Sequence, residues 1–166
     1  MDKQLYLHYY DDVYRFILYM THDEQLTNDL LQDTFYKFFK TDTRHIQQVK
    51  PYLLKIARNL ITDYFRKKRL IEMITLKEDK RIDDAPLPDD VIVQEELSLE
   101  LYNALYKLPL KYREVVILRY IEQYSVKETA SILKCKEARV KNDSARGIKT
   151  LRIQLEGGEL DDRAKT

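Results

Sequence analysis

Hydrophobic residues recur at three- and four-residue spacing through the first part of the chain, as they do on one face of an amphipathic helix. One such stripe covers residues 5–20, and a second covers residues 28–39, for which Asn28 is the expected N-cap. A third helix should run from Pro51, in its first turn, to about Leu70, with one apolar side and one basic side. These patterns predict a small helical domain.

The second part of the chain shows a different series of helices. A helix is expected from Leu97 to Pro109, and another from about Lys111 to Ile121. A short helix at 126–133, a three-residue break and a longer helix at 137–155 then form the pattern of a helix-turn-helix. The polar residues of the last helix that should remain available to an external surface are Arg139, Lys141, Asn142, Asp143, Arg146 and Lys149.

Between the two helical parts, residues 77–96 combine many carboxylates with two prolines and show no sustained period. Such a composition is typical of a flexible, extended linker. The predicted fold class is therefore all-α, with two small helical domains joined by a flexible acidic linker. The expected limits are 1–72 and 97–155 for the domains, 73–96 for the linker, and 156–166 for a polar, disordered tail.

The net charge of +1 conceals an uneven distribution along the chain. It amounts to −2 for residues 1–50, +5 for 51–69, −7 for 70–100 and +5 for 101–166. Two basic blocks that flank an acidic one suggest two surfaces for a polyanion, and nucleic acid is the obvious candidate.

Other features of the composition argue against several classes of protein. The single Cys135 cannot form an intramolecular disulfide, and no signal segment or run of eighteen apolar residues occurs, so we expect a cytoplasmic protein without membrane insertion. His8, His22 and His45 form no ligand-like cluster, and the three glycines form no phosphate-binding loop. We therefore expect no enzymatic activity, no metal and no cofactor.

Periodicity alone does not decide between a recognition helix and a solvated helix of mixed charge at residues 137–155. The basic run 66–69, with Tyr64 and Phe65 beside it, could meet single-stranded DNA, or the run could be a solvated helix end. For the two aromatic residues alone, a core position is the preferred interpretation.

Three sequence segments together resemble the extracytoplasmic-function (ECF, group IV) sigma factors of bacterial RNA polymerase, in the sigma-70 family. DLLQDTF at residues 29–35 is similar to the region-two signature of that family. PYLLKIARNLITDYFRKKR at 51–69 looks like its promoter-melting segment, and LPLKYREVVILRY at 108–120 like the start of region four. The resemblance covers nearly the whole chain and depends on the order and spacing of the segments.

This resemblance implies an alternative sigma factor that binds core RNA polymerase and directs promoter-specific transcription initiation in a stress response. The first domain would be sigma region 2 and the second sigma region 4. The implied partners are the β′ clamp coiled coil and the β flap of the polymerase, promoter DNA, and an anti-sigma factor, which in this family is often membrane-bound. The residues that match the polymerase-docking positions are Asp29, Gln32, Asp33 and Tyr36.

The resemblance also assigns residues to the two promoter elements. Those at positions that contact the minus-ten element are Arg58, Asn59, Asp63, Arg66 and Lys67. Those that would meet the minus-thirty-five duplex are Lys136, Arg139, Lys141, Asn142, Arg146 and Lys149. Lys134 stands where the family often has Gly, and Lys136 where it often has a Ser N-cap, so we expect a strained or differently shaped turn.

Two alternatives remain. One is a dimeric helix-turn-helix regulator that binds operator DNA, because REVVILRY followed by SVKETASIL also resembles two-component regulators. The helical periods throughout residues 1–70 argue against a receiver domain there, and the oligomeric state would discriminate. The other is an anti-sigma-like or structural adaptor whose basic surfaces bind protein, which the second basic domain makes less attractive.

Overall fold

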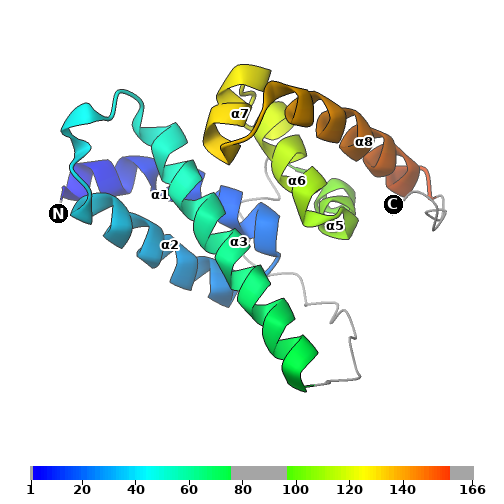
Figure 1. The fold of residues 1–166 in the computed structure, drawn as a ribbon, viewed down its shortest axis with the longest axis horizontal. Coiled ribbons are helices and arrows are strands. Elements are labelled where there is room, and N and C mark those ends of the chain that lie inside the picture. The colour runs from blue at the N-terminus through cyan, green and yellow to red at the C-terminus, as the bar shows by residue number, and fades with distance from the viewer. Residues whose placement is uncertain (1, 76–96, 158–166) are drawn as a thin grey trace. The chain divides into compact units, whose positions relative to one another are not determined.

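The computed structural model describes residues 2–75 and 97–157, and within these ranges the chain forms helices and turns without a strand (Figure 1). The chain folds as two compact units. We call residues 2–75 unit 1 and residues 97–157 unit 2. The predicted all-α fold class is confirmed. Most of the predicted linker and tail, residues 76–96 and 158–166, lies outside the described residues.

Unit 1 is a bundle of three helices that pack pairwise on one another: α1 (Lys3–Thr21), α2 (Glu24–Lys40) and α3 (Val49–Thr75). A short 3-10 turn, η1 (Thr43–His45), lies between α2 and α3. The largest side chains in the core, all nearly inaccessible to solvent, are Phe16, Ile17, Leu18, Tyr19, Met20, Leu31, Phe38, Leu53, Leu54 and Ile61. Burial of each large apolar side chain stabilises the bundle by about 1.5–3 kcal/mol.

The predicted start of the second helix was wrong. Asp23, not Asn28, is the N-cap of α2, because its carboxylate accepts a hydrogen bond from the amide of Leu26 at 3.0 Å. The misleading signal was Thr27, a polar residue that is fully buried. Its hydroxyl hydrogen-bonds to the carbonyl of Asp23 at 2.6 Å and to the hydroxyl of Thr21 at 3.0 Å, so it satisfies its polar atom inside the core.

The third predicted helix is confirmed at its start and extends further at its end. Pro51 occupies the first turn of α3, where no intrahelical partner for an N–H is needed. The helix continues to Thr75, so it includes residues 73–75 of the predicted linker. The hydrophobic residues of its last turns are exposed, so core packing does not define where the helix ends. These residues are Leu70, Ile71, Met73 and Ile74.

Unit 2 consists of α5 (Leu99–Lys107), α6 (Leu110–Val116), η2 (Ile117–Ile121), α7 (Val126–Leu133) and α8 (Glu137–Leu155). Helix α8 packs against α5, α6 and α7. Helices α7 and α8 begin and end at the predicted residues, which confirms the helix-turn-helix pattern. The predicted helix 111–121 differs, because its second half, η2, winds as a π-helix rather than an α-helix.

A buried arginine joins α6 to the end of α5. The guanidinium of Arg113 donates hydrogen bonds to the carbonyls of Leu105 at 2.9 Å, Tyr106 at 2.7 Å and Leu108 at 2.9 Å. These carbonyls belong to the end of α5, where acceptors have no intrahelical donors. Burial lowers the pKa of Arg113 to about 10, which still leaves it charged at neutral pH. Arg113 therefore serves as a C-terminal cap for α5.

Gly147 lets α8 approach α6 closely. A Cβ atom at this position would lie 2.7 Å from Cγ2 of Val116 and 3.4 Å from Cβ of Tyr112. Both neighbours are buried side chains of α6, so neither can turn aside into solvent. The absence of a side chain at residue 147 thus sets the distance between the last helix and the rest of unit 2.

We expect Gly147→Ala to destabilise unit 2 by about 1–2 kcal/mol. Overpacking costs about 1–3 kcal/mol, and the better helix propensity of Ala returns up to about 1 kcal/mol. Hydrogen exchange of α6 and α8 amides, read by mass spectrometry on the full chain, measures the effect. The double variant Gly147→Ala with Val116→Ala removes the clashing methyl group and should protect α8 better than Val116→Ala alone. If the amides of Gly147→Ala are protected from exchange as well as or better than those of the unsubstituted protein, the close approach imposes no constraint.

Candidate nucleic-acid and polymerase interfaces

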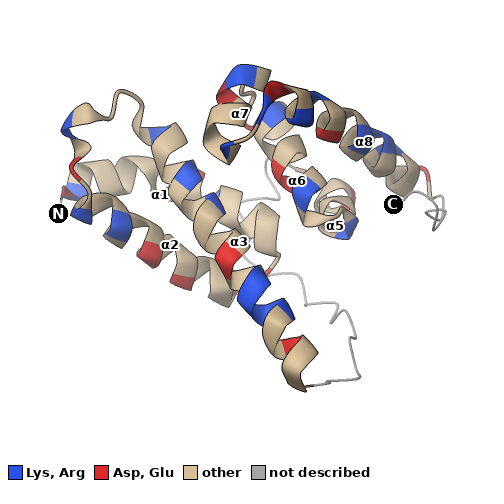
Figure 2. Ribbon diagram, viewed as in Figure 1, with Lys and Arg blue, Asp and Glu red and all other residues tan. Residues whose placement is uncertain are grey.

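Helix α2 presents an acidic side to solvent. The four predicted docking residues Asp29, Gln32, Asp33 and Tyr36 are all exposed, and their spacing places them on one side of the helix. Phe35 and Phe38 are buried on the opposite side and fix its orientation. The ammonium group of Lys40 lies 4.2 Å from the centroid of the Tyr36 ring. The structure therefore brings the predicted residues together as one surface, in which Asp29 and Asp33 contribute the negative charge. Figure 2 shows acidic residues of α2 in red.

The polar side of α3 carries the residues predicted for the minus-ten element. Arg58 and Asn59 are half-buried, and Nη1 of Arg58 donates a hydrogen bond to Oδ1 of Asn59 at 3.4 Å. Asp63, Arg66 and Lys67 are exposed, and Nη1 of Arg66 lies 3.6 Å from the Asp63 carboxylate. An exposed ion pair of this kind contributes about 0–1 kcal/mol, so it does not prevent Arg66 from moving to another anion.

The aromatic pair beside these residues is only partly consistent with a core position. The rings of Tyr64 and Phe65 meet edge to face at a centroid distance of 5.3 Å, and both side chains are half-buried. Neither belongs to the fully buried core of unit 1. The basic run 66–69 follows directly and lies within α3, not at its end. Cationic and aromatic groups therefore adjoin on the same stretch of α3, and Figure 2 shows the basic residues of this helix in blue.

The turn between α7 and α8 has the strained backbone that its sequence predicts. Lys134 adopts the left-handed conformation with φ 50° and ψ 52°, which a glycine would adopt at lower cost. The amide of Cys135 donates a hydrogen bond to the carbonyl of Ala130 at 3.0 Å, which closes the end of α7. Lys136 is the N-cap of α8 and forms no side-chain capping bond.

Most of the residues predicted for the minus-thirty-five duplex lie on the exposed side of α8. Lys136, Lys141, Asn142, Arg146 and Lys149 are exposed, whereas Arg139 is half-buried. Val140, Ser144 and Leu151 are buried on the opposite side, as their spacing predicts, and Ile148 is half-buried. The exposed side therefore combines cations for phosphates with an amide and guanidinium groups that suit base edges.

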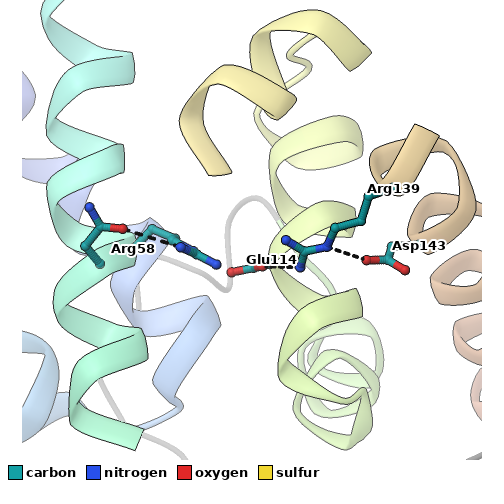
Figure 3. A network of polar contacts seen from close by, with 5 residues as sticks. Arg58, Glu114, Arg139 and Asp143 are labelled. Atoms are coloured by element: carbon teal, nitrogen blue, oxygen red, sulfur yellow. Dashed lines mark hydrogen bonds and ion pairs between the residues drawn. The ribbon is translucent and has the colours of Figure 1, made fainter. Parts of the chain in front are cut away.

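The prediction that Asp143 faces outward was wrong. Asp143 is buried, and its carboxylate accepts a hydrogen bond from Nε of Arg139 at 3.1 Å. Nη2 of Arg139 also lies 3.1 Å from Oε1 of the buried Glu114 on α6 (Figure 3). Glu114 was missed, although a carboxylate inside the apolar segment YREVVIL is a signal, because charges at such positions are usually paired.

Residues 2–75 and 97–157 contain no group of three or more His, Cys, Asp or Glu side chains that could hold a metal ion. In the same ranges, no helix has the length and apolar character needed to cross a membrane.

The sequence matches two family models in the order that the fold suggests. Residues 5–71 match Sigma-70 region 2, and residues 98–151 match Sigma-70, region 4. The ECF RNA polymerase sigma factor SigX of Bacillus subtilis (strain 168) is 38% identical over 160 residues, which cover 92% of this chain and 82% of that protein. The chain belongs to the ECF RNA polymerase sigma factors. SigM of the same organism is 31% identical over 166 residues, which cover 96% of this sigma factor and 98% of SigM.

Solved structures agree with the fold of this sigma factor. The sigma factor RpoE, solved in complex with the anti-sigma factor NepR from Bartonella quintana, aligns with a TM-score of 0.74 at 24% identity, covering 93% of this chain and 96% of that one. CnrH, solved with the cytosolic domain of CnrY, aligns with a TM-score of 0.62 at 20% identity, covering 94% of this chain and 88% of that one. Family membership confirms the resemblance inferred from the sequence and does not favour the operator-binding alternative.

We expect Lys134→Gly to stabilise the helix-turn-helix by about 1 kcal/mol. Glycine adopts the left-handed conformation without the clash of a Cβ atom, whereas other residues pay about 1–2 kcal/mol there. Thermal unfolding followed by circular dichroism measures the change. Lys134→Ala is the matched control, because it removes the same charge but keeps Cβ, and it should give no gain. An equal gain from both variants would mean that the lysine charge, not the backbone, destabilises the turn.

Proposed function

We propose that this protein acts in the cytoplasm as an alternative sigma factor, a non-enzymatic subunit that gives core RNA polymerase its promoter specificity. The observation that carries the proposal is the presence of both sigma regions in one chain, each with an exposed cationic surface on a helix held by its own core. Unit 1 would dock on the polymerase and open the minus-ten element, and unit 2 would bind the minus-thirty-five duplex.

Docking is assigned to the acidic side of α2. Carboxylates and an amide in a row suit a basic helical partner, such as the coiled coil of the β′ clamp. The exposed ring of Tyr36 adds apolar area within this charged surface. Because Phe35 and Phe38 anchor the helix from behind, the row is preorganised and little ordering is needed on binding.

Opening of the minus-ten element is assigned to α3. Extrusion of a base costs a few kcal/mol of lost stacking, and contacts to the edge and face of that base in the protein offset this cost only at a matching base. The Asn59 amide is suited to a base edge, and the exposed Arg66 and Lys67 to the phosphates beside it. Recognition and melting would then occur in the same step.

Regulation by an anti-sigma factor completes the proposal. The similar proteins RpoE and CnrH were solved with partner proteins, named an anti-sigma factor in the first case. Exposed cationic surfaces on α3 and α8 would bind bulk DNA without selectivity if nothing covered them, since phosphate contacts carry no sequence information. A partner that covers these surfaces until a stress signal arrives would keep the sigma factor off DNA. After its release, the sigma factor would contact the β flap of the polymerase.

Run-off transcription of host genomic DNA by core RNA polymerase, with and without this protein, tests the proposal. We expect new start sites that share two upstream sequence motifs at constant spacing, because two DNA-binding units in one chain read two elements. A core polymerase shown to be active with another sigma factor is the control. No new start sites with that polymerase would favour an operator-binding regulator instead.

Two substitutions should separate docking from opening. Asp33→Arg reverses a charge on the docking surface and should weaken core-polymerase binding at least about tenfold, measured by surface plasmon resonance. Asn59→Ala should leave that binding intact but reduce promoter opening about tenfold or more, read by permanganate reactivity of unpaired thymines.

Asp11→Arg is the matched control for docking, because it makes the same charge change at an exposed position of α1. It should bind core polymerase like the unchanged protein. Unchanged binding of Asp33→Arg would show that the docking surface lies elsewhere, and loss of polymerase binding by Asn59→Ala would refute its role in opening.

A further inference from the structure

The half-buried guanidinium of Arg139 is held between two carboxylates that solvent barely reaches. Its Nε donates to Oδ2 of Asp143, and its Nη2 lies beside Oε1 of Glu114, both at 3.1 Å (Figure 3). The side chains of Glu114 and Asp143 are 3% and 11% exposed, whereas that of Arg139 is 37% exposed. The acceptors come from two helices, α6 and α8, so they restrict the side chain from both sides.

This arrangement leaves part of the guanidinium for an outside acceptor. Arginine has five N–H donors in a rigid planar fork. Among the described residues, the contacts of Arg139 use the N–H of Nε and one N–H of Nη2, so both N–H groups of Nη1 and the second N–H of Nη2 remain for a ligand. Arg139 is also in the first turn of α8, and residues near the start of a recognition helix are those that reach base edges.

The electrostatics of the same arrangement disfavour a role in phosphate binding. Two carboxylates within 3.1 Å of the guanidinium oppose its charge, so Arg139 attracts a polyanion less strongly than a cation without such neighbours does. By contrast, Arg146 and Lys149 are exposed on the same side of α8 and have no carboxylate within ion-pair distance among the described residues. Phosphate contacts should therefore fall to these cations rather than to Arg139.

We propose that Glu114 and Asp143 hold Arg139 as a specificity-determining residue, which reads a hydrogen-bond acceptor on one base of the minus-thirty-five duplex and adds little to salt-dependent affinity. This rests on the proposed function, in which α8 meets that duplex. Guanine, with acceptors at O6 and N7 in the major groove, is the base that such a guanidinium fits. At a base that offers a donor instead, the remaining N–H groups of Arg139 find no acceptor. The two carboxylates also keep the side chain from turning toward another acceptor, which makes the selection strict.

The test uses holoenzyme assembled from core polymerase and the full chain, binding a promoter library with a randomised minus-thirty-five element at several KCl concentrations. Arg139→Gln should reduce the preference at one base position about five- to hundredfold. It should leave the slope of log affinity against log salt nearly unchanged. The matched variant Lys149→Gln should do the opposite, reducing the slope by about 0.9 without altering base preference.

Asp143→Asn keeps the shape of the side chain but removes the negative charge that attracts Nε of Arg139. It should weaken the same base preference and make the salt dependence steeper, because the charge of Arg139 becomes available to phosphate. Glu114→Gln removes the other charge and should change base preference and salt dependence in the same direction; if it fails to fold, Asp143→Asn still decides the test. Circular dichroism and core-polymerase binding show that each variant is intact.

Two outcomes would overturn the proposal, and they are distinguishable. If Arg139→Gln lowers the salt slope as Lys149→Gln does and leaves base preference unchanged, Arg139 is a phosphate contact, and only this inference fails. If the unsubstituted holoenzyme shows no preference anywhere in the minus-thirty-five element, the assignment of α8 to that duplex fails, and the inference fails with it.

Discussion

Burial of Val140, Gly147 and Leu151 within unit 2 decides which side of α8 meets solvent. The missing side chain at Gly147 lets the backbone of α8 approach Val116 and Tyr112 of α6. The exposed cations Lys141, Arg146 and Lys149 are placed by this packing, whereas Arg139 is also held by ion pairs of its own. The same dependence holds in unit 1, where Phe35 and Phe38 anchor α2 and leave its carboxylates outside. Core packing thus determines the chemistry of the surface.

Much of this could be predicted from the sequence, and the particular residues show why. The start of α7 follows from a strong local signal, since Ser125 and Glu128 form a capping box with hydrogen bonds of 3.0 and 3.1 Å. The exposed side of α2 follows from the spacing of its aromatic residues. Such features depend on neighbours within one or two turns, which a sequence displays directly.

Three of the failures concern burial, which depends on how the helices pack rather than on neighbours along the chain. Thr27 reads as a break in the apolar pattern, yet it is buried because Thr21 and Asp23 satisfy its hydroxyl. Asp143 has the sequence pattern of a surface carboxylate, yet it is buried and accepts a hydrogen bond from Arg139. The apolar residues in the last turns of α3 are exposed, so the apolar pattern does not show where the helix ends. Tertiary context overrides local pattern at each of these positions.

The two units use ion pairs in opposite ways, and the difference fits their proposed tasks. In unit 1 the pair Asp63–Arg66 is exposed and 3.6 Å long, so separating the two groups costs at most about 1 kcal/mol. In unit 2 the carboxylates beside Arg139 are almost inaccessible to solvent, so removing one of them disturbs the arginine more than breaking an exposed pair would. Opening a duplex requires side chains that rearrange as bases leave the stack, whereas selecting a closed duplex requires donors that stay in place. A mobile arginine on α3 and a fixed one on α8 match these two requirements.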